Sequence, residues 1–178
     1  MRREIRLSGF GGQGLILAGI ILAEAGMYDG HQVVQTQSYG PEARGGASKS
    51  EVVISSEAID YPKVTSPDVV LVMSDVACQR YACTVQQGGT LIVDSGLVKD
   101  VPPAPGQLYS VPITDVAKQA TGRAITANIV ALGVVNTIAG IVSPEALEKA
   151  VLSRVPKGTE ELNLKALRAG IEAAKAAM

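Results

Sequence analysis

The hydrophobic positions of the chain fall into two kinds of segment that alternate along its length. Short runs rich in Val, Ile and Leu predict strands at residues 4–8, 33–37, 51–55, 69–73, 90–95 and 108–113. Longer segments predict helices at residues 12–28, 75–87, 114–120, 125–139, 143–155 and from about 159 onward, with Asp75 and Ser143 as candidate N-caps. This alternation predicts an α/β fold: a three-layer α/β/α arrangement with a mostly parallel, Rossmann-like sheet and a helical C-terminal part.

Composition agrees with that architecture and bounds the number of domains. Apolar residues make up 47% of the 178 residues but aromatic residues only 3%, so the core must be built from Val, Ile, Leu and Ala. Such a core suits a sheet whose two faces are both covered by helices. The one clear break, the Pro-rich connection at residues 99–107, is too short to separate two domains. We therefore expect a single domain over residues 1–178.

One segment, residues 125–142, is apolar almost throughout and approaches the length of a membrane span. It carries Thr126 and Asn128 and has no basic flank, which favours a helix buried in protein, either by this chain or by a partner. Covering a sheet does not require a helix that is apolar on every side, so we expect residues 125–139 to contribute a partner surface. With no signal-like leader, the sequence predicts a cytoplasmic protein that does not bind membranes.

The net charge, the two cysteines and the single histidine argue against further classes of function. The net charge is −1 and basic residues do not cluster, which argues against nucleic-acid binding. Cys78 and Cys83 are interpreted as ordinary side chains, with a redox pair as the alternative. His31, the one histidine, cannot form a metal site alone and is expected at the surface or in packing.

A glycine-rich stretch, Ser-Gly-Phe-Gly-Gly-Gln-Gly, follows the first predicted strand and opens the first predicted helix. Its Gly9, Gly11 and Gly14 fit the dinucleotide fingerprint, in which helix N-terminal amides bind a phosphate. The fingerprint also needs an acid at the end of the second strand, where this chain has Gln35 and Gln37. Three interpretations stay open: a nucleotide site, a sharp turn needed only for tight packing, and a binding surface for something other than a nucleotide.

A second glycine-rich loop lies between the second and third predicted strands. Gly40, Gly45 and Gly46 permit backbone conformations that other residues avoid. They are expected to present Tyr39, Glu42 and Arg44 at the carboxyl edge of the sheet, where α/β proteins place their sites. Arg44 can bind a carboxylate or phosphate through two hydrogen bonds, or pair only with Glu42.

The two loops together, GFGGQGLILAG and QSYGPEARGGASKSEVVIS, resemble the γ subunit of the 2-oxoacid:ferredoxin oxidoreductases. The resemblance continues in DVVLVMSD, ANIVALGVV, GIVSPEALEKAV and ELNLKALRAG, and so covers essentially the whole chain. It implies a subunit of a complex that converts a 2-oxoacid and coenzyme A to acyl-CoA, CO₂ and reduced ferredoxin. It also implies that this chain has no catalytic activity by itself and borders the active site.

The resemblance further implies which groups belong to this chain and which to its partners. Thiamine diphosphate, magnesium and iron–sulfur clusters are expected on the partner subunits. The expected partners are α and β subunits and, through the complex, ferredoxin, with a ferredoxin-like δ subunit and a homodimer as further candidates. Coenzyme A is expected as co-substrate, and no cofactor is expected on this chain alone. The residues expected to face the partners, thiamine or coenzyme A are Gly9, Gly11, Gly12, Gln13, Gly14, Tyr39, Gly40, Pro41, Glu42, Arg44, Gly45 and Gly46. The alternatives are a free-standing nicotinamide- or flavin-binding oxidoreductase and a pure assembly module that binds no small molecule.

Overall fold

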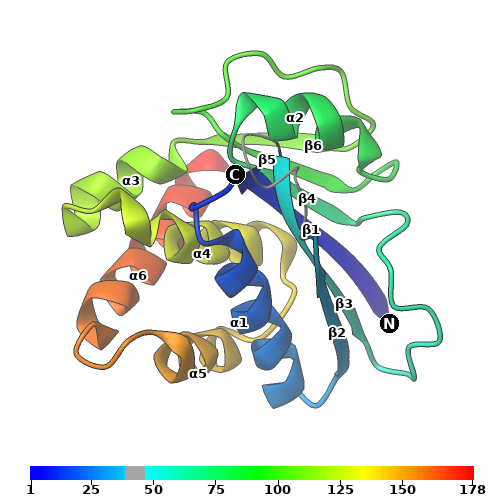
Figure 1. The fold of residues 1–178 in the computed structure, drawn as a ribbon, viewed down its shortest axis with the longest axis horizontal. Helices are drawn as coiled ribbons and strands as arrows, with labels where there is room; N and C mark the ends of the chain where they lie inside the picture. Colours follow the sequence, from blue (N-terminus) through cyan, green and yellow to red (C-terminus); the bar gives the residue numbers. More distant parts are fainter. Residues whose placement is uncertain (39–46) are drawn as a thin grey trace.

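The computed structural model describes residues 1–38 and 47–178, which form a six-stranded sheet flanked by helices (Figure 1). The strand order is β2-β3-β1-β4-β5-β6. The strands are β1 (Arg2–Phe10), β2 (Gln32–Gln37), β3 (Ala47–Ser55), β4 (Val69–Val72), β5 (Thr90–Asp94) and β6 (Gln107–Val111). All six predicted strands are present, and β6 lies at an edge and ends before Pro112, as a proline requires.

The prediction of a mostly parallel sheet is confirmed, with one reversed strand. β3 pairs antiparallel with both β1 and β2, whereas β1, β4, β5 and β6 pair in parallel. The pairing of β1 with β3 runs from Arg2 opposite Ser55 to Phe10 opposite Ala47. Both strands are therefore longer than the predicted residues 4–8 and 51–55, because each residue added to one strand finds a backbone partner in the other.

The helices are distributed unequally over the two faces of the sheet (Figure 1). One face carries α1 (Leu15–Tyr28), α3 (Ile113–Thr121), α4 (Ala127–Ala139), α5 (Pro144–Arg154) and α6 (Glu160–Ala177). The other carries α2 (Asp75–Tyr81), the 3₁₀ turn η2 (Ala82–Thr84) and the following loops. Alternate strand residues supply both cores: Leu71 packs with the five-helix layer, and Val70 and Val72 pack under α2.

The expectation that the apolar helix of residues 125–139 forms a partner surface is wrong for α4. Its residues from Ala127 to Asn136 are all buried, because α6 and α3 cover the sides that the sheet does not. The preceding 3₁₀ turn η3 (Ala124–Thr126) differs, since Ile125 is 68% exposed. Within the described residues, none of the helices has both the length and the apolar character needed to span a membrane.

Three predicted features of the helix ends also need correction, and the first is that the helix predicted over residues 75–87 ends at Tyr81 and is followed by η2. α1 begins at Leu15 rather than residue 12, because Gly12 and Gly14 have positive φ angles of 94° and 76° and cannot be helical. α2 is capped by Ser74 rather than Asp75: the Ser74 hydroxyl accepts a hydrogen bond from the amide of Ala77. Ser143 caps α5 as predicted, accepting from the amide of Ala146.

Candidate functional site at the carboxyl edge of the sheet

The candidate site lies where the loop between β1 and α1 meets the carboxyl ends of β4 and β5. In open α/β sheets this edge is where ligands bind. The structure places Gly9 inside β1, opposite Ser48 of β3, and places Gly11, Gly12, Gln13 and Gly14 in the loop that follows.

Gln13 fixes the loop to the ends of two strands. Its Oε1 accepts a hydrogen bond of 2.9 Å from the amide of Phe10, and its Nε2 donates one of 2.8 Å to the carbonyl of Met73. The amide of Met73 in turn donates to the carbonyl of Ser8 at 2.9 Å. The sequence predicts that Gln13 faces a partner, thiamine or coenzyme A, and does not predict this bracing role. No sequence signal reveals it, because it depends on β4 lying beside β1.

Close contacts disfavour a side chain at two of the glycines, and Gly14 also has a positive φ angle. A Cβ atom on Gly9 would lie 2.0 Å from Oε1 of Gln13. On Gly14 it would lie 2.6 Å from Nδ2 of Asn128, which donates to the Gly14 carbonyl at 3.3 Å. A Cβ on Gly12, by contrast, would meet nothing within 4 Å. The tight-packing interpretation therefore accounts for Gly9 and Gly14. It does not account for Gly11 and Gly12, which are exposed at the edge of the sheet.

The N-termini of two long helices meet at this loop. α1 begins directly after Gly14, and Asn128, in the first turn of α4, contacts the Gly14 carbonyl. Neither helix has a side-chain cap, and neither has an acidic residue in its first turn. The positive ends of the two helix dipoles favour a negatively charged group here. At α4 the amides of Ala127 and Ile129 are already bonded, to the carbonyl of Ala124 and to the Asn128 side chain.

Beside the loop is a hollow of about 350 Å³. It is lined by Phe10, Gly12, Gln13, Leu97, Thr114, Lys118, Ala124, Ile125 and Ala127. Two large apolar side chains on its rim face solvent, since Phe10 is 50% and Ile125 68% exposed. Among the described residues that line the hollow, Lys118 is the one cation, and its Nζ lies 3.6 Å from the carboxylate of Asp115. Apolar side chains with one cation suit a ligand or partner that is largely apolar with an anionic group.

Asp94 supports one wall of this hollow without entering it. The side chain is fully buried, and its Oδ2 accepts hydrogen bonds from the amide and hydroxyl of Thr114 at 3.0 and 2.5 Å. Its Oδ1 accepts from the amide of Gly96 at 3.1 Å. Burial raises the pKa of the Asp94 carboxyl above its ordinary value, although the hydrogen bonds from Thr114 and Gly96 lower it. Asp94 thus joins the end of β5 to the start of α3.

The second glycine-rich loop lies outside the described residues. Its expected site residues Tyr39, Gly40, Pro41, Glu42, Arg44, Gly45 and Gly46 all fall there. The described residue that follows, Ala47, is paired with Phe10 at the start of the first loop. The prediction that both loops leave the sheet at the same edge agrees with the position of Ala47.

A buried charged cluster on the α2 face was not predicted. Arg6 Nε and Glu51 Oε1 lie 2.7 Å apart in a buried ion pair, and Lys49 Nζ lies 3.0 Å from the same oxygen. The Arg6 guanidinium also lies 5.5 Å from the centre of the Tyr81 ring and donates to the hydroxyl of Thr84. The signal available in the sequence was an arginine between Ile5 and Leu7, in the middle of the first predicted strand. The cluster holds β1, β3 and α2 together.

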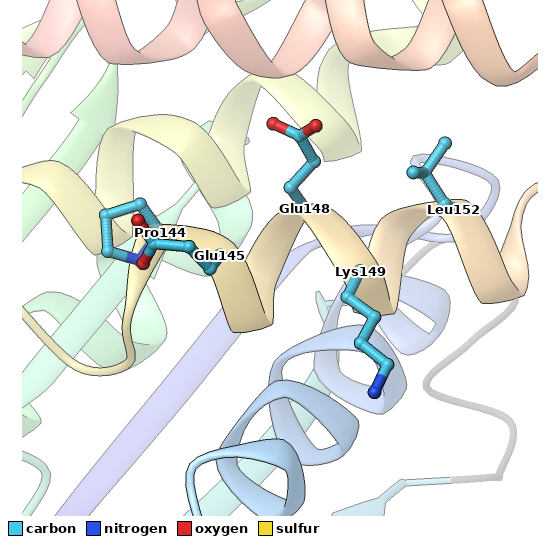
Figure 2. Close-up of a pocket in the computed structure, with 5 residues that line it drawn as sticks. All are labelled: Pro144, Glu145, Glu148, Lys149 and Leu152. Carbon is cyan, nitrogen blue, oxygen red and sulfur yellow. The ribbon is translucent and has the colours of Figure 1, made fainter.

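A second hollow, of about 390 Å³, runs along the outer side of α5 (Figure 2). It is lined by Pro144, Glu145, Glu148, Lys149 and Leu152. Figure 2 shows the Glu148 side chain pointing toward α6 and that of Lys149 toward α1, where its Nζ lies 4.1 Å from the Tyr28 ring centre. Glu148 and Lys149 therefore point away from each other. Among residues 1–38 and 47–178, no group of three or more His, Cys, Asp or Glu side chains is arranged to hold a metal ion.

Comparison with known proteins matches nearly the whole chain to one family. The family model "Pyruvate ferredoxin/flavodoxin oxidoreductase" matches residues 4–173. The 2-oxoglutarate synthase subunit KorC of Methanocaldococcus jannaschii is 53% identical over 178 residues, covering 98% of this chain and 95% of that protein. These matches confirm the resemblance seen in the two loops. They support the γ-subunit interpretation and not a free-standing nicotinamide- or flavin-binding oxidoreductase.

Solved structures agree. The γ subunit of the keto/oxoacid ferredoxin oxidoreductase of Geobacter sulfurreducens is 54% identical, with a TM-score of 0.92, over 99% of this chain and 98% of that chain. The 2-oxoglutarate:ferredoxin oxidoreductase of Magnetococcus marinus, solved with 2-oxoglutarate, coenzyme A and succinyl-CoA bound, has a TM-score of 0.87 at 24% identity. That likeness concerns the fold alone and covers 99% of this chain but 32% of that chain.

Proposed function

The chain belongs to the pyruvate ferredoxin/flavodoxin oxidoreductase family as a γ-type subunit, and we propose that its complex acts on 2-oxoglutarate. In that reaction 2-oxoglutarate and coenzyme A give succinyl-CoA and CO₂, and the electrons pass to ferredoxin. The observation that carries the choice of substrate is the 53% identity with a 2-oxoglutarate synthase subunit along nearly the full length of both chains.

Within that cytoplasmic complex, the role of this chain is to border the active site. Thiamine diphosphate, magnesium and the iron–sulfur clusters belong to the α and β partners, with a ferredoxin-like δ subunit as a further candidate. The exposed Phe10 and Ile125 on the rim of the carboxyl-edge hollow give a partner subunit an apolar surface to cover.

The same edge is suited to the anionic part of coenzyme A. The N-termini of α1 and α4 converge on the Gly9–Gly14 loop, Gly11 and Gly12 are exposed, and Lys118 lies across the hollow. Backbone amides and a lysine together bind phosphate well. Tyr39, Glu42, Arg44, Gly45 and Gly46, from the second loop, are proposed to face the partners or coenzyme A beside it.

The first test is anaerobic co-purification of the tagged chain from its native cells. The eluate is assayed for coenzyme A-dependent reduction of a viologen dye with 2-oxoglutarate, pyruvate and branched-chain 2-oxoacids. Preference for 2-oxoglutarate with α and β partners present supports the proposal. Preference for another 2-oxoacid overturns the substrate assignment. Recovery of the chain alone, without activity, overturns its proposed role in a complex.

A second test separates coenzyme A binding from assembly. Lys118→Gln and Arg44→Ala are expected to raise the KM for coenzyme A while leaving the KM for the 2-oxoacid unchanged. Lys157→Gln, an exposed lysine between α5 and α6, is the matched control. If both variants alter only the yield of assembled complex, the chain is an assembly module; if neither alters assembly or KM, the edge assignment is wrong.

A further inference from the structure

The outer side of β2 carries backbone groups that can pair with a further strand. The amide of Ser38 donates to the carbonyl of Lys49, so in this antiparallel pair the even-numbered residues of β2 bond to β3. Bonding alternates along such a pair, so the N–H and C=O groups of the odd-numbered Val33 and Gln35 point away from β3. None of the described residues supplies a backbone partner for them.

This edge lacks the features that usually prevent strands from pairing between molecules. Natural edge strands are commonly protected by lysine, proline, inward charges or bulges. β2 reads Gln-Val-Val-Gln-Thr-Gln, without charge or proline, and pairs with β3 along all six of its residues. An uncharged, regular edge of this kind is a template for another strand.

An apolar stripe of α1 accompanies the open edge. Ile16, Ile20 and Met27 lie on one side of the helix, since they are four and seven residues apart. Met27 is 62% exposed and the two isoleucines are half-buried. The other sides of α1 face the sheet, α4 and α5, the last through the ion pair of Glu24 with Arg154.

The stripe lies beyond the outer edge of the sheet, next to β2. α1 packs on β3 and β2, and the end of the helix lies directly over the strand, where a Cβ on Gly26 would be 2.9 Å from Cγ1 of Val33. Because α4 contacts α1 from the inner side, toward β4, the opposite side of α1 faces outward. The stripe and the β2 edge thus lie on the same side of the molecule. The charged residue beside the stripe, Glu24, is paired with Arg154 of α5.

We propose that this surface binds a second copy of the chain, with β2 of one copy pairing antiparallel with β2 of the other. The surface is self-complementary, as a twofold interface requires. Antiparallel pairing gives the outward groups of Val33 and Gln35 partners in both copies, and the same rotation brings the two α1 stripes together above the joined sheet. Neither stripe nor strand carries a charge to repel its counterpart, and each chain has a net charge of only −1.

The test is the mass of the full-length chain by sedimentation velocity over a range of concentrations. A species of twice 18.4 kDa is expected. In hydrogen exchange, the amides of Val33 and Gln35 should be protected at concentrations where the dimer predominates and should exchange quickly on dilution. A chain that stays monomeric at high concentration overturns the proposal, as does a dimer in which these two amides exchange freely.

Charge variants test whether the α1 stripe is part of the contact. Ile20, near the middle of the stripe, should face its own counterpart, so Ile20→Asp and Ile20→Lys should each weaken the dimer by about a hundredfold. A mixture of the two variants should recover it, which also shows that both fold. Val76→Asp, at an exposed apolar position on α2, should have no effect. If the dimer tolerates Ile20→Asp, or if mixing the two variants does not restore it, the chain associates through another surface. The β2 edge would then be free to pair with a strand of a different subunit.

Discussion

Gly133 of α4 and Gly170 of α6 face each other where the two helices cross. A Cβ atom on Gly170 would lie 2.1 Å from the carbonyl oxygen of Val130, and one on Gly133 would lie 2.5 Å from that of Leu167. The backbones are therefore in direct contact, which is how α6 covers a helix that is buried on every side. This crossing holds α6 against α4.

Gly170→Ala should destabilise the protein by about 2–3 kcal/mol, because the added methyl group meets backbone atoms that cannot move aside. The loss is measured as the free energy of unfolding in urea. Lys165→Ala, at an exposed position of the same helix, should stay within about 0.5 kcal/mol of the wild type. Equal stability of Gly170→Ala and the wild type would mean that the helices do not cross this closely.

Arg6→Ala should cost about 3 kcal/mol, because it leaves the buried carboxylate of Glu51 with Lys49 as its remaining ion-pair partner. The double variant Arg6→Met with Glu51→Leu should recover most of that loss, since it removes both buried charges and keeps the volume. Lys175→Ala, which breaks the exposed pair with Glu172, is the control and should cost less than about 0.5 kcal/mol. If the double variant were less stable than Arg6→Ala, the cluster would be stabilising in a way that charge pairing does not explain.

Asp94 should make stability depend on pH in a known direction. Its pKa in the folded protein is raised from the ordinary 3.8, so between 3.8 and the raised value the folded state binds more protons than the unfolded state. Stability contributed through this group therefore increases as pH falls through that window and is lost as pH rises through the folded pKa. As the pH is lowered from neutral, the free energy of unfolding of the wild type should rise relative to that of Asp94→Asn. A difference that is flat, or of opposite slope, would show that burial does not dominate at Asp94.

Gln13→Ala should lower the activity of the assembled complex while the chain stays folded. The variant loses both bonds that hold the loop to β1 and β4, at a cost of about 1–2 kcal/mol, and frees Gly11 and Gly12 to move at the proposed coenzyme A edge. The expected result is a several-fold higher KM for coenzyme A. Gln13→Glu keeps the acceptor for Phe10 but sets an oxygen against the Met73 carbonyl, so it should resemble Gln13→Ala.

Gln119→Ala, at an exposed position on α3, is the matched control for this series. If Gln13→Ala unfolded the chain without changing KM in the complex that remains, the loop would serve packing alone.

The sequence predicted the elements of the fold better than their arrangement. Every strand and helix could be placed from apolar periodicity, because periodicity reports which side of an element is buried. It does not report which element does the burying. The reversed β3 between β2 and β1 was therefore hidden, as was the covering of α4 by α6, although Gly133 and Gly170 in helical segments were a usable hint.

The candidate site was predictable to the same extent. The loop glycines stand out in the sequence because positive φ angles and close contacts restrict the choice of residue at Gly12 and Gly14. Gln13, Asn128 and Lys118 could not be singled out, since each acts through neighbours 60 or more residues away or from across a hollow. Long-range contacts of this kind follow from the strand order and leave no local pattern.

The position of β1 between β3 and β4 has a consequence for the newly made chain. β1 leaves the ribosome before both of the strands that flank it: one of its edges is covered only when β3 has been made and the other only when Val72 has been added. Until then a strand with buried apolar positions such as Ile5 and Leu7 has open edges. Between the synthesis of β1 and that of Val72, this strand therefore needs protection from other unfinished chains.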